Sequence, residues 1–244
     1  MSKFYFRGSL YQIFISVFGL LMSTMNPALA GGVDITSFGH SSLLIKGGGS
    51  SVLLNPFRAV GCAAGLQEPK ISADVILASS TLADEGARVA QGLFLVKPGS
   101  YQVKRMNFEG FLLDHDRFEG RRFGKATAWI WKQGGLTFAH LGGAAGELTT
   151  ENKILIGRPD VLIIGVGGGA KVYDGIEAAK IVRDLNPKRV IPVQYLQKSQ
   201  PNNCDQNGIE LFLESMKDVD VKKVGKLFAV PKSIKNDLTI NIIE

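Results

Sequence analysis

The side chains that could do chemistry in this 244-residue chain stand where apolar runs give way to polar loops. All three histidines lie at such positions, namely His40 in "FGHSS", His115 in "LLDHDRF" and His140 in "FAHLGG". Loops held by a rigid sheet often carry functional groups, and imidazole serves as an acid, a base or a metal ligand. A single histidine is more often structural, but three at strand ends predict one shared cleft.

A second set of polar groups lies in the stretch "ADVILASSTLADEGA", residues 73–87, where an apolar strand runs into a loop without histidine or cysteine. By residue type, Ser80 could act as a nucleophile with His115 and with Asp84 or Asp116. The spacing does not support this interpretation, because the Gly-x-Ser-x-Gly turn that presents such a serine is absent.

The loop "GGGAKVYDG" offers Lys171 and Tyr173 beside three consecutive glycines, Gly167–Gly169. A lysine and a tyrosine can bind or activate a carboxylate-bearing ligand, and glycines let backbone N–H groups approach it closely. The alternative is a tight turn with a solvated lysine. The residues that we consider as catalytic candidates are His115, His140, Lys171 and Tyr173.

The N-terminus is typical of a cleaved secretory signal peptide, residues 1–30. Lys3 and Arg7 precede the apolar run "IFISVFGLLM", and "NPALA" supplies a small-x-small cleavage pattern. A run of ~10 apolar residues is short against the ~20 that span a bilayer. We therefore expect an exported protein, in a periplasm or an equivalent lumen, without a stable membrane anchor after cleavage.

The remaining residues, 31–244, predict a single domain, because no Pro- or Ser-rich linker divides them. Removing two of the 28 basic residues leaves 26 against 22 acidic ones, a mild and scattered excess that excludes a nucleic-acid-binding surface. Cys62 and Cys204 are the only cysteines. In an oxidising compartment we expect them to form a disulfide, with two free thiols as the alternative.

Strand patterns dominate the first half of the mature chain, and strands alternate with helices in the second half. Helices are expected near residues 151–156, at "IEAAKIVRDL" and near 208–216, the second of them stopped by Pro187. The fold class predicted from this order is α+β, with two mixed sheets flanked by helices.

The order of motifs resembles the metallo-β-lactamase superfamily, within it the small lactonase-like and uncharacterised zinc-dependent hydrolases. The motifs are "GHSSLLIKGGGSSVLLNPF", "ADVILASSTLADEG", "HD", "FAHLGG", "RPDVLIIGVGG" and "AAKIV" followed by "LNPKRVIPVQY". The resemblance covers residues 33–195. It implies a four-layer αββα sandwich with the site at the edge where strands of both sheets end.

The resemblance also implies where metal ligands would stand. Members carry Thr-His-x-His-x-Asp-His after the strand that corresponds to "DVILAS". Aligned on that strand and on the aspartate, Ser80 and Leu82 replace the first two histidines. Asp84 keeps the aspartate, and Glu85 replaces the third histidine.

The later ligand positions are altered as well. His115 matches the next histidine of the family. Gly143 stands at the bridging aspartate, and Gln194 stands at the last histidine, just before Tyr195. A catalytic zinc needs about three protein ligands and an open position for water, so this set predicts that the usual two-metal centre is lost.

Two hypotheses about function follow from this set. The first is a non-catalytic binding or structural pseudo-hydrolase without a cofactor, whose ligand is a small molecule or an exported protein. The second is a hydrolase of a small ester, lactone or phosphate-bearing substrate, either metal-free or with one zinc, iron or manganese ion held by Asp84, Glu85 and His115. A simpler role for the two carboxylates is to cap and charge the start of a following helix. Further cleft positions are His40, Ser80, Gln194 and Tyr195.

Overall fold

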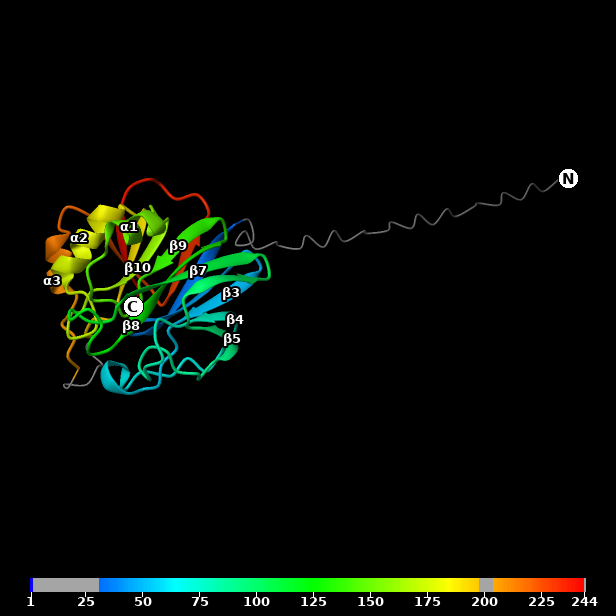
Figure 1. Cartoon of the computed structure of the whole chain (residues 1–244). Coiled ribbons are helices and arrows are strands. Elements are labelled where there is room, and N and C mark those ends of the chain that lie inside the picture. Colours follow the sequence, from blue (N-terminus) through cyan, green and yellow to red (C-terminus); the bar gives the residue numbers. More distant parts are fainter. Residues whose placement is uncertain (2–30, 198–203, 244) are drawn as a thin grey trace.

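The strands form two sheets in the computed structural model, which describes residue 1 and residues 31–197 and 204–243 (Figure 1). The sheets pack face to face, and the α-helices cover the outer face of one of them. The elements are β1 Gly32–Gly39, β2 Ser42–Gly47, β3 Ser50–Leu54, η2 Gly61–Ala63, β4 Ser72–Leu77, β5 Gln91–Leu95, β6 Gly99–Val103, β7 Met106–Asp114, β8 Lys125–Gln133, β9 Leu136–His140, α1 Thr150–Ile156, β10 Val161–Gly165, α2 Gly175–Leu185, β11 Arg189–Val193, α3 Glu210–Ser215, β12 Asp220–Val224, β13 Leu227–Pro231 and β14 Thr239–Ile243.

The first sheet has the strand order β13-β1-β2-β3-β4-β5, and the second has β12-β14-β11-β10-β9-β8-β7-β6. Antiparallel pairs join consecutive strands such as β2 and β3, while β9, β10 and β11 are parallel. Parallel strands need crossovers, which here carry α1 and α2. The predicted α+β class with two mixed sheets is confirmed.

The core between the sheets is built from alternate residues of the strands that face each other. Trp129, Trp131 and Phe138 of the second sheet are buried against Ile35 and Val52 of the first. Trp131 and Phe138 stack at 4.9 Å between ring centroids. This apolar layer holds both sheets rigidly, so the loops at their common edge start from fixed positions.

The helices begin and end at residues that satisfy their free backbone groups. Asp174 accepts hydrogen bonds from two N–H groups at the start of α2, and Asn186 ends that helix in a left-handed conformation. Thr149 caps α1 in the same way. Apolar side chains of all three helices pack on the second sheet. The outer face of the first sheet instead buries Leu53 and Ile76 against partly buried apolar residues.

Three local predictions need correction or completion. The apolar and polar alternation of "SYQVKRMNF" alone predicts one strand, but the run divides into β6 and β7, because Lys104 has a positive φ and the chain turns there. No helix follows Asp84, since residues 82–90 form turns and bends. The sequence pattern also missed β12, whose polar residues lie at a sheet edge.

The predicted signal peptide lies at residues 1–30, and its cleavage falls outside the described residues. Within the described part, no helix has the length and apolar character to cross a membrane.

Candidate functional site

The loops that follow β4, β7, β9 and β11 meet at one edge of the sandwich. Hydrogen bonds from β8 fix the start of the loop after β4: the Thr127 N–H donates to Ser79 O at 2.7 Å, and the Trp129 indole N–H donates to Ala78 O at 3.1 Å. His115 directly follows β7, and Gln194 directly follows β11. The three histidines stand at the ends of β1, β7 and β9 as predicted, and all three side chains are buried.

Glu85 is the centre of the side chains that this edge brings together. Its Oε1 lies 2.6 Å from His115 Nε2 and accepts a hydrogen bond from Ser80 Oγ at 2.8 Å. Its Oε2 accepts a hydrogen bond from Gln194 Nε2 at 2.9 Å. Glu85 and His115 are both completely buried. Three side chains at ligand positions of the family, Ser80, His115 and Gln194, therefore contact the carboxylate of Glu85, which stands at a fourth such position. Both carboxylate oxygens of Glu85 have a partner.

The electrostatics of Glu85 make it a poor base. Burial alone would raise the pKa of its carboxyl group, but the His115 contact, the charge of Lys171 and the Ser80 hydroxyl together lower that pKa to about 2. A general base is most effective when its pKa is close to the working pH. Glu85 is therefore a permanent anion near neutral pH.

Gly143 leaves the space that the Glu85–His115 pair occupies. A Cβ atom at this position would lie 2.3 Å from Glu85 Oε2 and 2.6 Å from His115 Nε2, closer than real Cβ contacts allow. In the alignment with the metallo-β-lactamase superfamily, this glycine replaces the bridging aspartate. The Glu85 carboxylate occupies the volume next to the glycine. The two replacements are sterically complementary.

Asp84 turns away from this group. Its Oδ2 lies 2.8 Å from Lys171 Nζ, in an ion pair whose two side chains are mostly buried. Asp84 caps no helix, and Glu85 is not charge in a first helical turn, so that simpler role was wrong. The ammonium group of Lys171 likewise has a partner, because it donates a hydrogen bond to Asp84 Oδ2.

The described residues contain only one group of three His, Cys, Asp or Glu side chains with ligand atoms within 4.8 Å of one another, and it is Cys62, Cys204 and Asp205. The predicted set of Asp84, Glu85 and His115 does not come together in this arrangement.

His40 and His140 lie near Glu85 but are buried and neutral at physiological pH. Burial lowers the pKa of His140 to about 4, against the smaller opposing effect of the Glu85 charge. Burial likewise lowers the pKa of His40. Among the described atoms, Nδ1 of His40 and both ring nitrogens of His140 have no hydrogen-bond partner.

Other candidates have structural contacts in place of catalytic ones. The Tyr173 hydroxyl donates to Gly146 O at 2.7 Å, and burial raises the pKa of Tyr173. Asp116 accepts hydrogen bonds from four backbone N–H groups of residues 118–123, including Phe123 N at 2.7 Å. Ser80 donates to Glu85, so no triad of Ser80, a histidine and Asp116 forms. Tyr195 is buried after β11.

Sequence reasoning missed two residues that build this edge. Asn55 accepts a hydrogen bond from Ser79 N at 2.8 Å and thereby fixes the start of the Glu85 loop. Asp205 accepts a hydrogen bond from Ala170 N at 3.1 Å and anchors the glycine loop. The left-handed φ of Asn55 follows a conformational preference of asparagine that could have signalled it.

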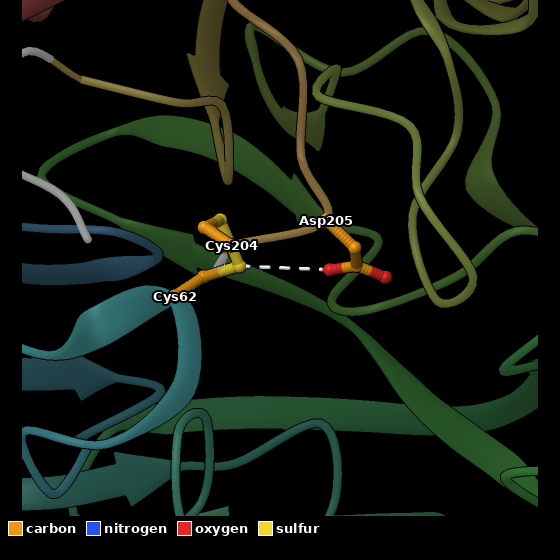
Figure 2. Close-up of side chains that lie close together, drawn as sticks. All are labelled: Cys62, Cys204 and Asp205. Atoms are coloured by element: carbon orange, nitrogen blue, oxygen red, sulfur yellow. Dashed lines mark hydrogen bonds between the residues drawn. A yellow bond between two sulfur atoms is a disulfide. The ribbon is translucent and has the colours of Figure 1, made fainter. Parts of the chain in front are cut away.

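The predicted disulfide between Cys62 and Cys204 is formed, with 4.7 Å between the Cα atoms (Figure 2). It joins the segment between β3 and β4 to the segment between β11 and α3. Asp205 Oδ1 lies 3.5 Å from Cys62 Sγ (Figure 2). A disulfide sulfur carries no hydrogen, so this contact is not a hydrogen bond.

Comparison with known proteins gives a family, a relative and solved structures that this chain is similar to. A family model described as the beta-lactamase superfamily domain matches residues 34–194. A metal-dependent hydrolase of Thermococcus kodakarensis is 25% identical over 192 residues, which are 67% of this chain and 84% of that protein.

Solved structures share the fold. A proposed zinc-dependent hydrolase of the metallo-β-lactamase superfamily from Thermotoga maritima has a TM-score of 0.68 at 24% identity, covering 87% of this chain and all of that one. An isothiocyanate hydrolase from Delia radicum gut bacteria has a TM-score of 0.60 at 11% identity, covering 85% and 95% of the two chains.

Proposed function

The chain belongs to the beta-lactamase superfamily domain family, and from that premise we propose that it is a non-catalytic member in which a buried charge network replaces the metal centre. One observation carries the proposal: Glu85 contacts His115 at 2.6 Å in space that only a glycine at position 143 leaves open. The family and the relative described as a metal-dependent hydrolase imply that a metal ion could bind.

The residues present do not fit the two-metal centre of the resembling family. Leu82 offers no donor atom, and Gly143 offers no side-chain donor. Glu85 already accepts from Ser80 and Gln194 and contacts His115, so a metal would have to displace partners from both of its oxygens. Removing a partner from a buried charge costs about 3–5 kcal/mol, because the charge is left uncompensated. We therefore assign the network a stabilising role.

Two buried groups of this edge, Glu85 and His140, are poorly suited to activate water at neutral pH. The pKa of Glu85 lies at about 2 and that of His140 at about 4, both below the range in which a side chain exchanges protons efficiently near pH 7. Lys171 is neutralised by Asp84. The proposal accordingly leaves binding or scaffolding as the role, with a small molecule or an exported protein as the partner.

A second candidate function is a hydrolase with one zinc, iron or manganese ion bound by Asp84, Glu85 and His115. It is favoured by four buried ring nitrogens that lack hydrogen-bond partners among the described atoms: Nδ1 of His40, Nδ1 of His115 and both nitrogens of His140. It requires Asp84 to leave Lys171 and turn toward Glu85, because those two side chains now form an ion pair.

Metal content and hydrolysis separate the two candidates. The oxidised mature protein is dialysed against zinc, iron(II) or manganese(II), and bound metal is measured beside turnover of ester, lactone and phosphoester substrates. The proposal expects no stoichiometric metal and no turnover. Stoichiometric metal that is lost in His115→Ala, or turnover that is lost in the same variant, would establish the second candidate. Lys46→Ala is the matched control, since its side chain is exposed on β2.

Export is part of the proposal, with cleavage after Ala30. Fractionation of cells followed by N-terminal sequencing tests it. A chain that begins at Gly31 in the exported fraction supports the proposal, and a chain that retains residues 1–30 in the cell contradicts it.

A further inference from the structure

The carboxylate of Asp205 lies next to the disulfide between Cys62 and Cys204, although the disulfide has no S–H group that could donate a hydrogen bond to it. Oδ1 of Asp205 lies 3.5 Å from Cys62 Sγ (Figure 2). The oxidised sulfurs gain nothing from this oxygen, because neither carries a hydrogen. The other carboxylate oxygen, Oδ2, accepts a hydrogen bond from Ala170 N at 3.1 Å. The backbone thus points one oxygen of Asp205 at the sulfur pair.

The side chains of Cys62, Cys204 and Asp205 would supply metal ligands once the disulfide is reduced. We propose that reduction of Cys62–Cys204 converts this cluster into a binding site for a thiophilic divalent ion such as zinc, with Asp205 as the third ligand. Their ligand atoms lie within 4.8 Å of one another. Two thiolates, one carboxylate and a water molecule make a four-coordinate tetrahedral set that suits zinc.

The positions of Asp205 Oδ1 and Cys62 Sγ already match such a site. Zinc bonds of about 2.3 Å to sulfur and about 2.0–2.2 Å to oxygen, at tetrahedral angles, separate a sulfur and an oxygen ligand by about 3.5 Å. The observed separation of Asp205 Oδ1 and Cys62 Sγ is 3.5 Å. The two sulfurs, now covalently bonded, must separate before both can bind one ion.

The surroundings support the carboxylate in this role. The hydrogen bond from Ala170 N orients Asp205, as outer hydrogen bonds orient the ligands of other metal sites. Gly169 makes the approach possible, because a Cβ there would lie 2.8 Å from Asp205 Oδ2, and its φ is +72°. Asp205 is exposed and Cys204 is partly exposed, so an ion can reach the cluster from solvent.

The chemistry balances with an external dithiol as the reductant. The S–S bond between Cys62 and Cys204 breaks while a new one forms in the dithiol, and two electrons and two protons pass to the cysteines. Binding of the ion then releases the two thiol protons to solvent and forms two metal–sulfur bonds. This site is separate from the Glu85–His115 network, and the inference does not rest on the proposed function.

Cobalt(II) tests the inference, because its thiolate complexes absorb through charge transfer. The protein is reduced with a phosphine, freed of reductant without oxygen and titrated. We expect the thiolate-to-cobalt band at one equivalent in reduced wild type, displaced by zinc, and no band in the oxidised form. Asp205→Asn weakens binding at least about tenfold, the scale of losing one metal contact. Lys46→Ala, a change at an exposed side chain of β2, binds as wild type does.

Thermal unfolding keeps the inference falsifiable if the reduced chain is less stable. Zinc should raise the melting temperature of the reduced wild type and leave that of Cys62→Ser/Cys204→Ser unchanged. The inference is overturned by a reduced wild type that shows neither the band nor a zinc-dependent shift. It is also overturned by a double serine variant that binds as well as wild type does.

Discussion

Replacing Gly143 by alanine tests the complementarity between that glycine and Glu85. The new Cβ would lie 2.3 Å from Glu85 Oε2, whereas real Cβ contacts stay above 3.0 Å, so the carboxylate must move by at least 0.7 Å, the difference between those distances. The φ of Gly143 lies outside the left-handed region, so alanine adds no backbone strain. The effect of the change is therefore steric.

The expected cost follows from packing and charge. Overpacking a well-packed interior costs about 1–3 kcal/mol, and displacing the carboxylate from His115 adds part of the cost of breaking a buried pair. We expect Gly143→Ala to lower the free energy of unfolding by about 3 kcal/mol. For a domain of this size that corresponds to a fall in melting temperature of roughly 6–12 °C.

A double-mutant cycle with Glu85→Ala isolates the interaction. Removing the Glu85 carboxylate vacates the space that the new Cβ needs, so the double variant should be more stable than the sum of the two single effects by about 1–3 kcal/mol. Urea unfolding at neutral pH, followed by circular dichroism, measures all four proteins. Gly225→Ala is the matched control, because a Cβ there meets nothing within 4 Å. Effects that add within about 0.5 kcal/mol would refute the reasoning.

Three further predictions concern the same edge of the sandwich. The pKa of Glu85 is lowered from 4.5 to about 2, so the stability that this carboxylate contributes is complete above pH 4.5 and is lost as the pH falls to about 2. The difference in unfolding free energy between wild type and Glu85→Gln should therefore shrink by about 3 kcal/mol over that window. A difference that does not change with pH would contradict this. The Cys62→Ser/Cys204→Ser variant should unfold about 4–5 kcal/mol more easily because the bridge closes a separation of 142 residues; denaturant melts that match oxidised wild type would contradict it. Asp84→Asn should lower the free energy of unfolding by about 0.5–1 kcal/mol. Lys171→Gln should lower it little further once Asp84 is replaced, since the two side chains form one partly buried ion pair. Additive losses in urea melts would show that each side chain acts alone.

The elements of the fold could be predicted where the periodicity was strong. The amphipathic run of α2, with Asp174 at its start and Asn186 at its end, gives both bounds. The edge strand β12 could not be found, because four of its five residues are exposed and no apolar alternation marks them. Its pairing with β14 is a long-range contact that a local pattern does not contain.

The candidate site could be predicted by position and not by contacts. The resemblance placed Glu85, His115 and Gln194 at ligand positions, and the structure shows that these three side chains meet. It could not show that Asp84 turns to Lys171, because that pair joins loops 87 residues apart. The match between Gly143 and Glu85 likewise depends on distances in space.

The most direct test of the central claim is the metal content of the oxidised mature protein after exposure to zinc, iron(II) and manganese(II), with wild type and His115→Ala measured in parallel. The account predicts that neither protein retains stoichiometric metal, because Ser80, His115 and Gln194 occupy the Glu85 carboxylate. Retention of one or more equivalents by wild type, with loss in His115→Ala, would contradict it.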